Sequence, residues 1–200
     1  MATSPFQQQV NRNYTSGFVG EIAHDGPMRL KPGRIASATG NTVGRVFGYS
    51  GDAPATGVTL AAFSPQVVVG GAVFYGVLSI PKHYALFGTS QGPLAASYNL
   101  PEGTDAEFAD MAILHGELFN ETTAVKAVSY GDSLAYVSTA TTAAQNPQGL
   151  PLGAIVSVPA GADAPAGFTP IPNSRVINPI SLAASGANPV SGVTKIQLTQ

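Results

Sequence analysis

The sequence contains no cysteine and no tryptophan among its 200 residues. Without cysteine the chain has no disulfide framework, no thiol nucleophile and no cysteine-ligated zinc. Charge is also scarce: Asp, Glu, Lys and Arg make up 10% of the residues, against about 25% in an ordinary soluble protein. The formal net charge of −2 gives no general attraction to nucleic acid or to an anionic membrane. We therefore expect neither nucleic acid nor a membrane as a partner.

A long uninterrupted hydrophobic run is also absent. The longest apolar stretch, VVVGGAVFYGVLSI at residues 67–80, contains glycines and is shorter than the roughly 20 residues that span a bilayer as a helix. The opening residues, MATSPFQQQ, have neither the basic region nor the apolar region of a secretory signal. We therefore expect a soluble protein that is synthesised in a cytoplasm.

So little charge admits two interpretations of the surface. Hydrophobic residues make up 44% of the chain, too many for an intrinsically disordered protein, and 200 residues are enough for one domain with its own core. The outside of that domain is then either an ordinary quiet surface or a surface that another protein covers.

Short β-prone runs separated by turn residues are what the sequence has in quantity. They lie at residues 18–23, 33–38, 43–49, 58–63, 73–80, 83–88, 108–114, 116–120, 133–139, 153–158, 175–183 and 193–200. No amphipathic segment of helical length lies between them, as a βα-alternating sheet would need. The pattern predicts an all-β fold, an antiparallel β-sandwich or barrel. In the last run we expect Thr194, Ile196 and Leu198 to share one face.

The first 18 residues differ from the rest of the chain. Ser4, Pro5 and Gln7 are placed as in a capping box with proline at the first helical position, which predicts a short helix over about residues 5–12 followed by an extended arm. Apolar residues recur every four positions, at Phe6, Val10, Tyr14 and Phe18. This stripe needs a cover, which is either the body of the same molecule or a neighbouring subunit. We divide the chain into an N-terminal arm with a lead-in strand, residues 1–32, and a β-sandwich body, residues 33–200.

Charges of opposite sign are separated along the chain. Five of the nine basic residues lie within the first 45 positions: Arg12, Arg29, Lys31, Arg34 and Arg45. Six of the eleven acidic residues lie within residues 102–121. Such a distribution is either plain solvated surface or suited to contact between copies, or between a basic arm and an acidic partner.

One motif resembles a catalytic site. GTSQG at residues 88–92 has the spacing of a serine nucleophile elbow around Ser90, and Asp105 or Asp110 followed by His115 completes the order of a hydrolase triad. The elbow must open a helix, and here only a few residues precede Pro101. The three histidines are far apart, and no phosphate-binding or dinucleotide-binding motif is present. We expect no enzyme activity, no cofactor and no metal.

Both ends of the chain resemble a known family. FQQQVNRNYTSGFVGEIAHDGPMRLKPGRIASATG at residues 6–40 and IPNSRVINPISLAASGANPVSGVTKIQLTQ at residues 171–200 are similar to structural cement, or capsid decoration, proteins of tailed bacteriophages. The resemblance implies a jelly-roll-like β body and a multimeric protein on the outside of an icosahedral head. There it would clamp adjacent copies of the major capsid protein. The resemblance brings no catalytic residues, and it is weakest over residues 81–130.

From the composition of the arm we expect the partner contacts to come from Phe6, Val10, Arg12, Tyr14, Phe18, Arg29 and Arg34. The partners would be the major capsid protein and further copies of this chain, as a dimer or trimer, in the virion. Two other functions stay open at this point. One is a host-surface or carbohydrate-binding β-sandwich that uses Tyr75, Tyr84 and Tyr98, although the absence of tryptophan weakens it. The other is the hydrolase built on Ser90.

Overall fold

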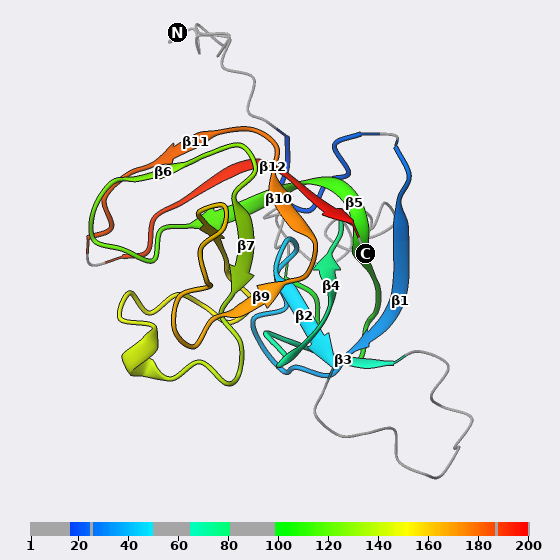
Figure 1. Ribbon diagram of the computed structural model, residues 1–200. Coiled ribbons are helices and arrows are strands. Elements are labelled where there is room, and N and C mark those ends of the chain that lie inside the picture. Colours follow the sequence, from blue (N-terminus) through cyan, green and yellow to red (C-terminus); the bar gives the residue numbers. More distant parts are fainter. Residues whose placement is uncertain (1–16, 25, 50–64, 81–98, 187, 200) are drawn as a thin grey trace, which may run out of the picture.

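One long strand, β5 (Asp105–Phe119), organises the chain. The computed structural model describes residues 17–24, 26–49, 65–80, 99–186 and 188–199, and Figure 1 shows β5 running through the middle of the molecule. The first half of β5 pairs with β1 (Arg29–Ile35). Its second half pairs with β12 (Ser191–Thr199) over nine residue pairs. A strand of this length covers about 50 Å, so it is long enough to pair with different strands along its two halves.

Around the first half of β5 the sheet closes into a barrel. The remaining strands are β2 (Val46–Tyr49), β3 (Gln66–Val69) and β4 (Val73–Leu78). The strands are ordered β1-β3-β2-β4-β5, and β1 also pairs with β5, which completes the ring. The pairing of β1 with β3 is parallel and the others are antiparallel. Inside lie the aromatic side chains of Phe47, Tyr75 and Phe108, in contact with one another.

A second group of strands surrounds the other half of β5. Its members are β7 (Ser133–Tyr136), β8 (Ile155–Val158), β9 (Thr169–Ile171) and β10 (Ser174–Val176). β8 runs parallel to the end of β5, and β10 pairs with β12. The Val176 N–H donates to the Asp132 carbonyl at 2.8 Å, which brings β10 back beside β7. The core of this group includes Leu114, Leu118, Leu134, Tyr136, Ile155, Val176, Ile196 and Leu198.

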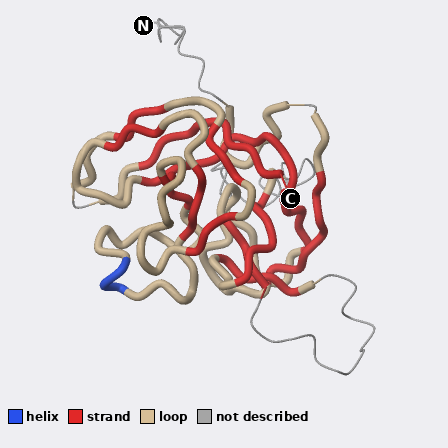
Figure 2. Tube along the Cα trace, viewed as in Figure 1, coloured by secondary structure: helices blue, strands red, loops and turns tan. Residues whose placement is uncertain are grey.

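A separate two-stranded ribbon joins β6 (Lys126–Val128) to β11 (Ile180–Leu182). The part of the chain that the structure describes contains one helical segment, the 3-10 turn Ala143–Gln145, which is the short blue piece in Figure 2. No helix among these residues is long and apolar enough to cross a membrane.

The all-β prediction is confirmed, as a barrel-like sheet of mainly antiparallel strands. The predicted alternation in β12 is also confirmed, because Thr194, Ile196 and Leu198 are buried while their neighbours are more exposed. The helix expected over residues 5–12 and the strands expected at 58–63 and 83–88 lie outside the described residues.

Several strand boundaries predicted from the sequence are wrong. Residues 108–114 and 116–120 were expected to form two strands, but β5 continues through Gly116 because β12 pairs with it on both sides of that residue. The run at 175–183 divides into β10 and β11, which pair with different partners. The run at 18–23 forms only an isolated bridge, Ile22 to Leu114. β3, β6 and β9 were not expected as strands.

The tightest backbone packing joins β2 to the turn between β3 and β4. A Cβ atom on Gly48 would lie 2.4 Å from the Gly71 carbonyl oxygen and 2.5 Å from that of Val73. The Gly71 carbonyl also accepts a hydrogen bond of 2.6 Å from the buried Tyr136 hydroxyl. The Gly71 peptide therefore has no freedom to move away from a side chain at position 48.

We predict that Gly48→Ala lowers the free energy of unfolding by about 2 kcal/mol or more, as overpacking against fixed atoms does. Gly186→Ala is the matched control, because a Cβ there meets nothing within 4 Å and should change stability by less than about 0.5 kcal/mol. Urea unfolding followed by circular dichroism measures both. Equal stability of the two variants would contradict the close approach.

Candidate interaction surface

The acids and the histidine of the expected hydrolase triad do not form a catalytic group. Asp110 and His115 lie on the same strand, five positions and about 16 Å apart along it. Asp105 is ten positions from His115 on this strand, a separation of about 33 Å. Neither acid orients the imidazole. Ser90 lies outside the described residues, and among those described no three His, Asp or Glu side chains are grouped to hold a metal.

Asp110 instead forms an ion cluster with β1. Its buried carboxylate accepts hydrogen bonds from Arg29 Nε at 2.8 Å and Arg29 Nη2 at 2.7 Å, and Lys31 Nζ lies 2.9 Å away. Burial alone would raise the pKa of Asp110, but the hydrogen bonds and charges of Arg29 and Lys31 outweigh it and hold that pKa below its ordinary value. The cluster therefore stabilises the fold at neutral pH, and this contribution is lost as the pH falls through the lowered pKa.

Tyr75 is not available to stack on a sugar. Its side chain is 3% exposed, its hydroxyl donates to the Pro32 carbonyl, and the Lys31 ammonium sits 4.2 Å from the ring centroid. Burial raises the pKa of Tyr75 to about 12, with further contributions from Tyr49 and Asp110. Tyr75 is a core residue, so the carbohydrate-binding prediction is wrong for it. Tyr84 and Tyr98 lie outside the described residues.

The expected partner-binding residues that the structure describes are spread along β5. Phe18 is 64% exposed and lies close in sequence to the bridge between Ile22 and Leu114. Arg29 pairs with Met111 and Arg34 with Asp105, so the two arginines are about 20 Å apart along the strand. Arg29 is committed to Asp110 yet half-exposed, and Arg34 is exposed. Phe6, Val10, Arg12 and Tyr14 lie outside the described residues.

The segment that leads out of the arm is fixed to β5. Residues 17–23, which we call the root segment, form three backbone hydrogen bonds with it. These are Gly20 N–H to His115 O at 2.8 Å, His115 N–H to Glu21 O at 2.9 Å, and Ala23 N–H to Ile113 O at 2.8 Å. β12 occupies the other edge of β5 at these positions. Anything attached to Gly17 therefore starts from a defined point on the body.

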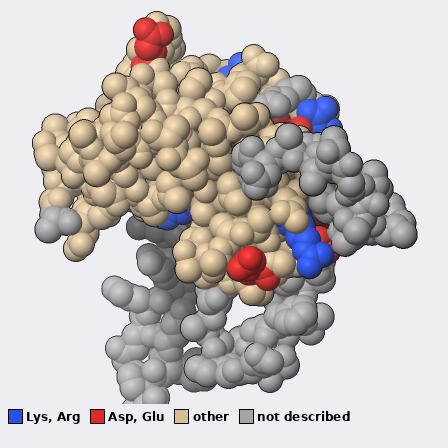
Figure 3. All heavy atoms as spheres, turned by 90° about the horizontal axis from the view of Figure 1, so that it is seen from below, with Lys and Arg blue, Asp and Glu red and all other residues tan. Residues whose placement is uncertain are grey.

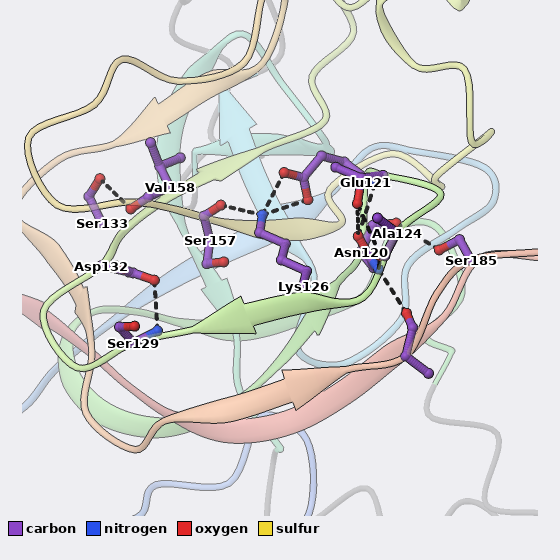
Figure 4. Close-up of polar contacts among 12 residues, drawn as sticks. Asn120, Glu121, Ala124, Lys126, Ser129, Asp132, Ser133, Ser157, Val158 and Ser185 are labelled. Atoms are coloured by element: carbon purple, nitrogen blue, oxygen red, sulfur yellow. Dashed lines mark hydrogen bonds and ion pairs between the residues drawn. The ribbon is translucent and has the colours of Figure 1, made fainter.

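Asn120, at the end of β5, holds the β6–β11 ribbon in place. Its fully buried side-chain amide donates to the carbonyls of Ala124 and Ala183, both at 2.7 Å, and its side-chain oxygen accepts from the Thr122 N–H. The Ser185 hydroxyl donates to the Asn120 carbonyl at 3.2 Å. Figure 4 shows Asn120 in contact with Ala124, which precedes β6, and with Ser185, which follows β11. An isolated two-stranded ribbon is marginally stable in water, so this anchoring fixes its position.

The only cation of the ribbon points inward. Lys126 Nζ contacts both carboxylate oxygens of Glu121, at 2.5 and 2.6 Å, and donates to the Ser157 carbonyl at 2.6 Å (Figure 4). Both side chains are largely buried. The opposite side of the ribbon, which includes the exposed Val125, Ala127 and Ser181, is consequently uncharged.

The segment from β7 to β10 continues this uncharged surface. Residues 133–174 include one charged side chain, Asp163, and Figure 3 shows how little of the molecular face it draws carries charge. Side chains fix the loops of this segment: Thr141 Oγ1 donates to the Gly167 carbonyl at 2.7 Å, and Asn146 exchanges two hydrogen bonds with Leu150. We call residues 138–153, which contain no charged side chain, the neutral loops.

A rigid uncharged surface is suited to contact with another protein, because no charge must be desolvated on binding. It offers nothing to phosphate or carboxylate ligands. The sequence could have indicated this surface, because residues 133–174 contain a single charged residue. The contact residues that we expected from the sequence lie elsewhere.

The sequence matches the family described as structural cement protein (E217 gp24/Pam3 gp6) over residues 6–199. This chain belongs to that family of phage structural cement proteins. The cement protein is similar in fold to a chain from the capsid of Myoviridae phage XM1, with a TM-score of 0.55 and 10% sequence identity over 98% of this chain and 99% of that one. At this identity the likeness shows the fold alone. No curated protein sequence matches the chain.

Membership confirms the family resemblance of the two ends and extends it through the middle of the chain. The family is one of phage structural proteins, in agreement with the expectation that this chain is not an enzyme.

We predict that Glu121→Gln destabilises the cement protein by about 3 kcal/mol, because it leaves the Lys126 ammonium buried without its counter-charge. The double variant Glu121→Leu with Lys126→Met should lose less, because it removes both charges. Urea unfolding of Glu121→Leu, Lys126→Met and the double variant measures the coupling between the two residues. Purely additive losses would contradict the buried ion pair.

Proposed function

We propose that this cement protein binds the outside of a tailed-phage head, clamps adjacent copies of the major capsid protein and so stabilises the shell. The family match over residues 6–199 carries this proposal. The low charge of the surface supports it, because a cement protein needs contact area and shape and no reactive group. A standard interface buries about 800 Å² on each partner. Repetition of modest contacts by the symmetry of the head multiplies the effective affinity.

In this proposal residues 1–32 act as an arm with its lead-in strand, and residues 33–200 as the body. The arm contacts come from Phe6, Val10, Arg12, Tyr14 and Phe18, with Arg29 and Arg34 as polar contacts beside them. Sixteen residues precede Gly17 and have a maximum reach of roughly 55 Å, enough to cross a neighbouring subunit. The fixed root segment supports such a role, because an arm can hold a neighbouring subunit against the body only if the end nearest the body is anchored.

We further propose that the neutral loops face the capsid, and that copies of the protein associate as dimers or trimers on the head. Ordered loops lose little conformational entropy on binding. Their exposed alanines, among them Ala143 and Ala144, allow close approach of a flat partner.

Deletion of residues 1–16 tests the arm. The truncated protein should keep its circular dichroism spectrum and melting temperature, because the root segment and its three hydrogen bonds to β5 remain. It should fail to co-sediment with heads that lack cement protein. Full-length protein is the control, and full occupancy of heads by the truncated protein would contradict the arm as a clamp.

Single carboxylates test the neutral loops. Ala143→Glu and Ala144→Glu should each weaken head binding at least about tenfold, because burying an unpaired carboxylate costs several kcal/mol. Ala38→Glu is the matched control, since Ala38 is also exposed but lies in the turn after β1. Quantitative co-sedimentation measures the three affinities. Equal affinities for all three variants would exclude the loops from the interface.

A further inference from the structure

His115 is a buried histidine without the hydrogen bonds that burial normally demands. The residue is 6% exposed, and both ring nitrogens are buried with no hydrogen-bond partner among the described residues. A neutral imidazole carries one donor and one acceptor, and buried polar atoms of this kind are almost always paired. The ring is therefore held where water cannot reach it and where neither of its nitrogens forms a hydrogen bond.

The root segment is what covers this ring. A Cβ atom on Gly17 would lie 2.2 Å from His115 Cε1 and 2.3 Å from Nδ1, so only a glycine backbone fits over the imidazole. Gly17 has a φ of 114°, a backbone conformation that residues with a side chain rarely adopt. The backbone of His115 itself holds the segment through two of its three hydrogen bonds. The cover and the ring are thus parts of one local structure.

The charges around the ring do not balance a proton on it. From the root segment, Glu21 Oε2 lies 3.7 Å from Nδ1, and its side chain is 48% exposed. From β12, Lys195 is paired directly opposite His115, and its positive charge disfavours a proton on the ring. Glu117, two positions along β5, is 3.7 Å from Arg45 and accepts a hydrogen bond from Ser191. Burial lowers the pKa of His115, Glu21 opposes this and Lys195 adds to it.

We propose that His115 is a pH-sensitive latch for the root segment, closed over the neutral imidazole and opened when the ring takes up a proton from water. With the segment in place, a second ring N–H has no solvent and no acceptor within hydrogen-bond distance, because Glu21 Oε2 is 3.7 Å from Nδ1 and accepts from the Phe18 N–H. When residues 17–23 lift from β5, water hydrates both ring nitrogens. The latch operates in the free protein, so this inference goes beyond the proposed function and does not depend on it.

The direction follows from linkage. A group that is neutral when covered, with a covered pKa below its uncovered value of about 6.5, binds fewer protons in the closed state. The equilibrium constant for closure of the root segment is therefore greatest above about pH 6.5. Below that pH it falls by up to about tenfold per pH unit, until the covered pKa is reached. His24, the residue after the root segment, is exposed.

Hydrogen exchange of the full-length protein tests the latch. After correction for the intrinsic exchange rate, the protection of the Gly20 and Ala23 amides should fall about tenfold between pH of about 7.5 and about 5.5. The amides of β8 should keep their protection and serve as an internal reference. In His115→Gln, which retains His24, the protection of the root segment should not depend on pH.

Two results would overturn the latch: root-segment protection in the natural protein that is independent of pH, or an equal fall in His115→Gln. If His115→Gln does not fold, the ring of the natural protein is titrated by nuclear magnetic resonance instead. A His115 pKa below about 6.5, with root-segment resonances shifting at the same midpoint, supports the latch. A pKa at or above that value overturns it.

Discussion

The continuity of β5 is the constraint on which the rest of the structure depends. Its first half completes a closed barrel with β1 and β4, and its second half supports β12, β8 and the root segment. The two groups of strands share this strand and also one hydrophobic cluster, in which Val46 and Val77 pack with Leu114, so the position of one group fixes the other. Interfaces between separate domains within a chain usually permit relative motion. A shared strand allows none without breaking its ladder, and a protein that reinforces a shell benefits from that stiffness.

The same architecture explains where the few charges are. Asp110 forms ion pairs with Arg29 and Lys31, and Glu121 forms one with Lys126, so these charges are neutralised within the molecule. A buried ion pair adds little net stability compared with apolar packing. Its effect here is positional: one cluster ties β1 to β5 and the other turns the ribbon lysine inward. The neutral loops and the outer side of the ribbon therefore carry no charged side chain, which suits a surface that contacts another protein.

Much of the fold could be predicted from the sequence, because strand-length runs and turn residues alternate throughout. β12 was predicted well since its apolar and polar residues alternate without a break. β6 and β9, which were not expected, are three residues each, so they are held by pairing and their residues alone do not predict a strand. Contact residues were harder to predict. The neutral loops carry no motif, and the packing of Gly17 on His115 joins residues that are distant in sequence and are brought together only by the fold.

The pairing of β12 with β5 also has a consequence for biosynthesis. Phe119 is translated long before its partner Ser191, so the hydrophobic side of β5 stays uncovered while the intervening chain is made. Folding dominated by such distant pairings is slow. The nascent polypeptide must therefore remain soluble on the ribosome with half of its central strand exposed, and the molecule becomes complete only when β12 emerges from the exit tunnel.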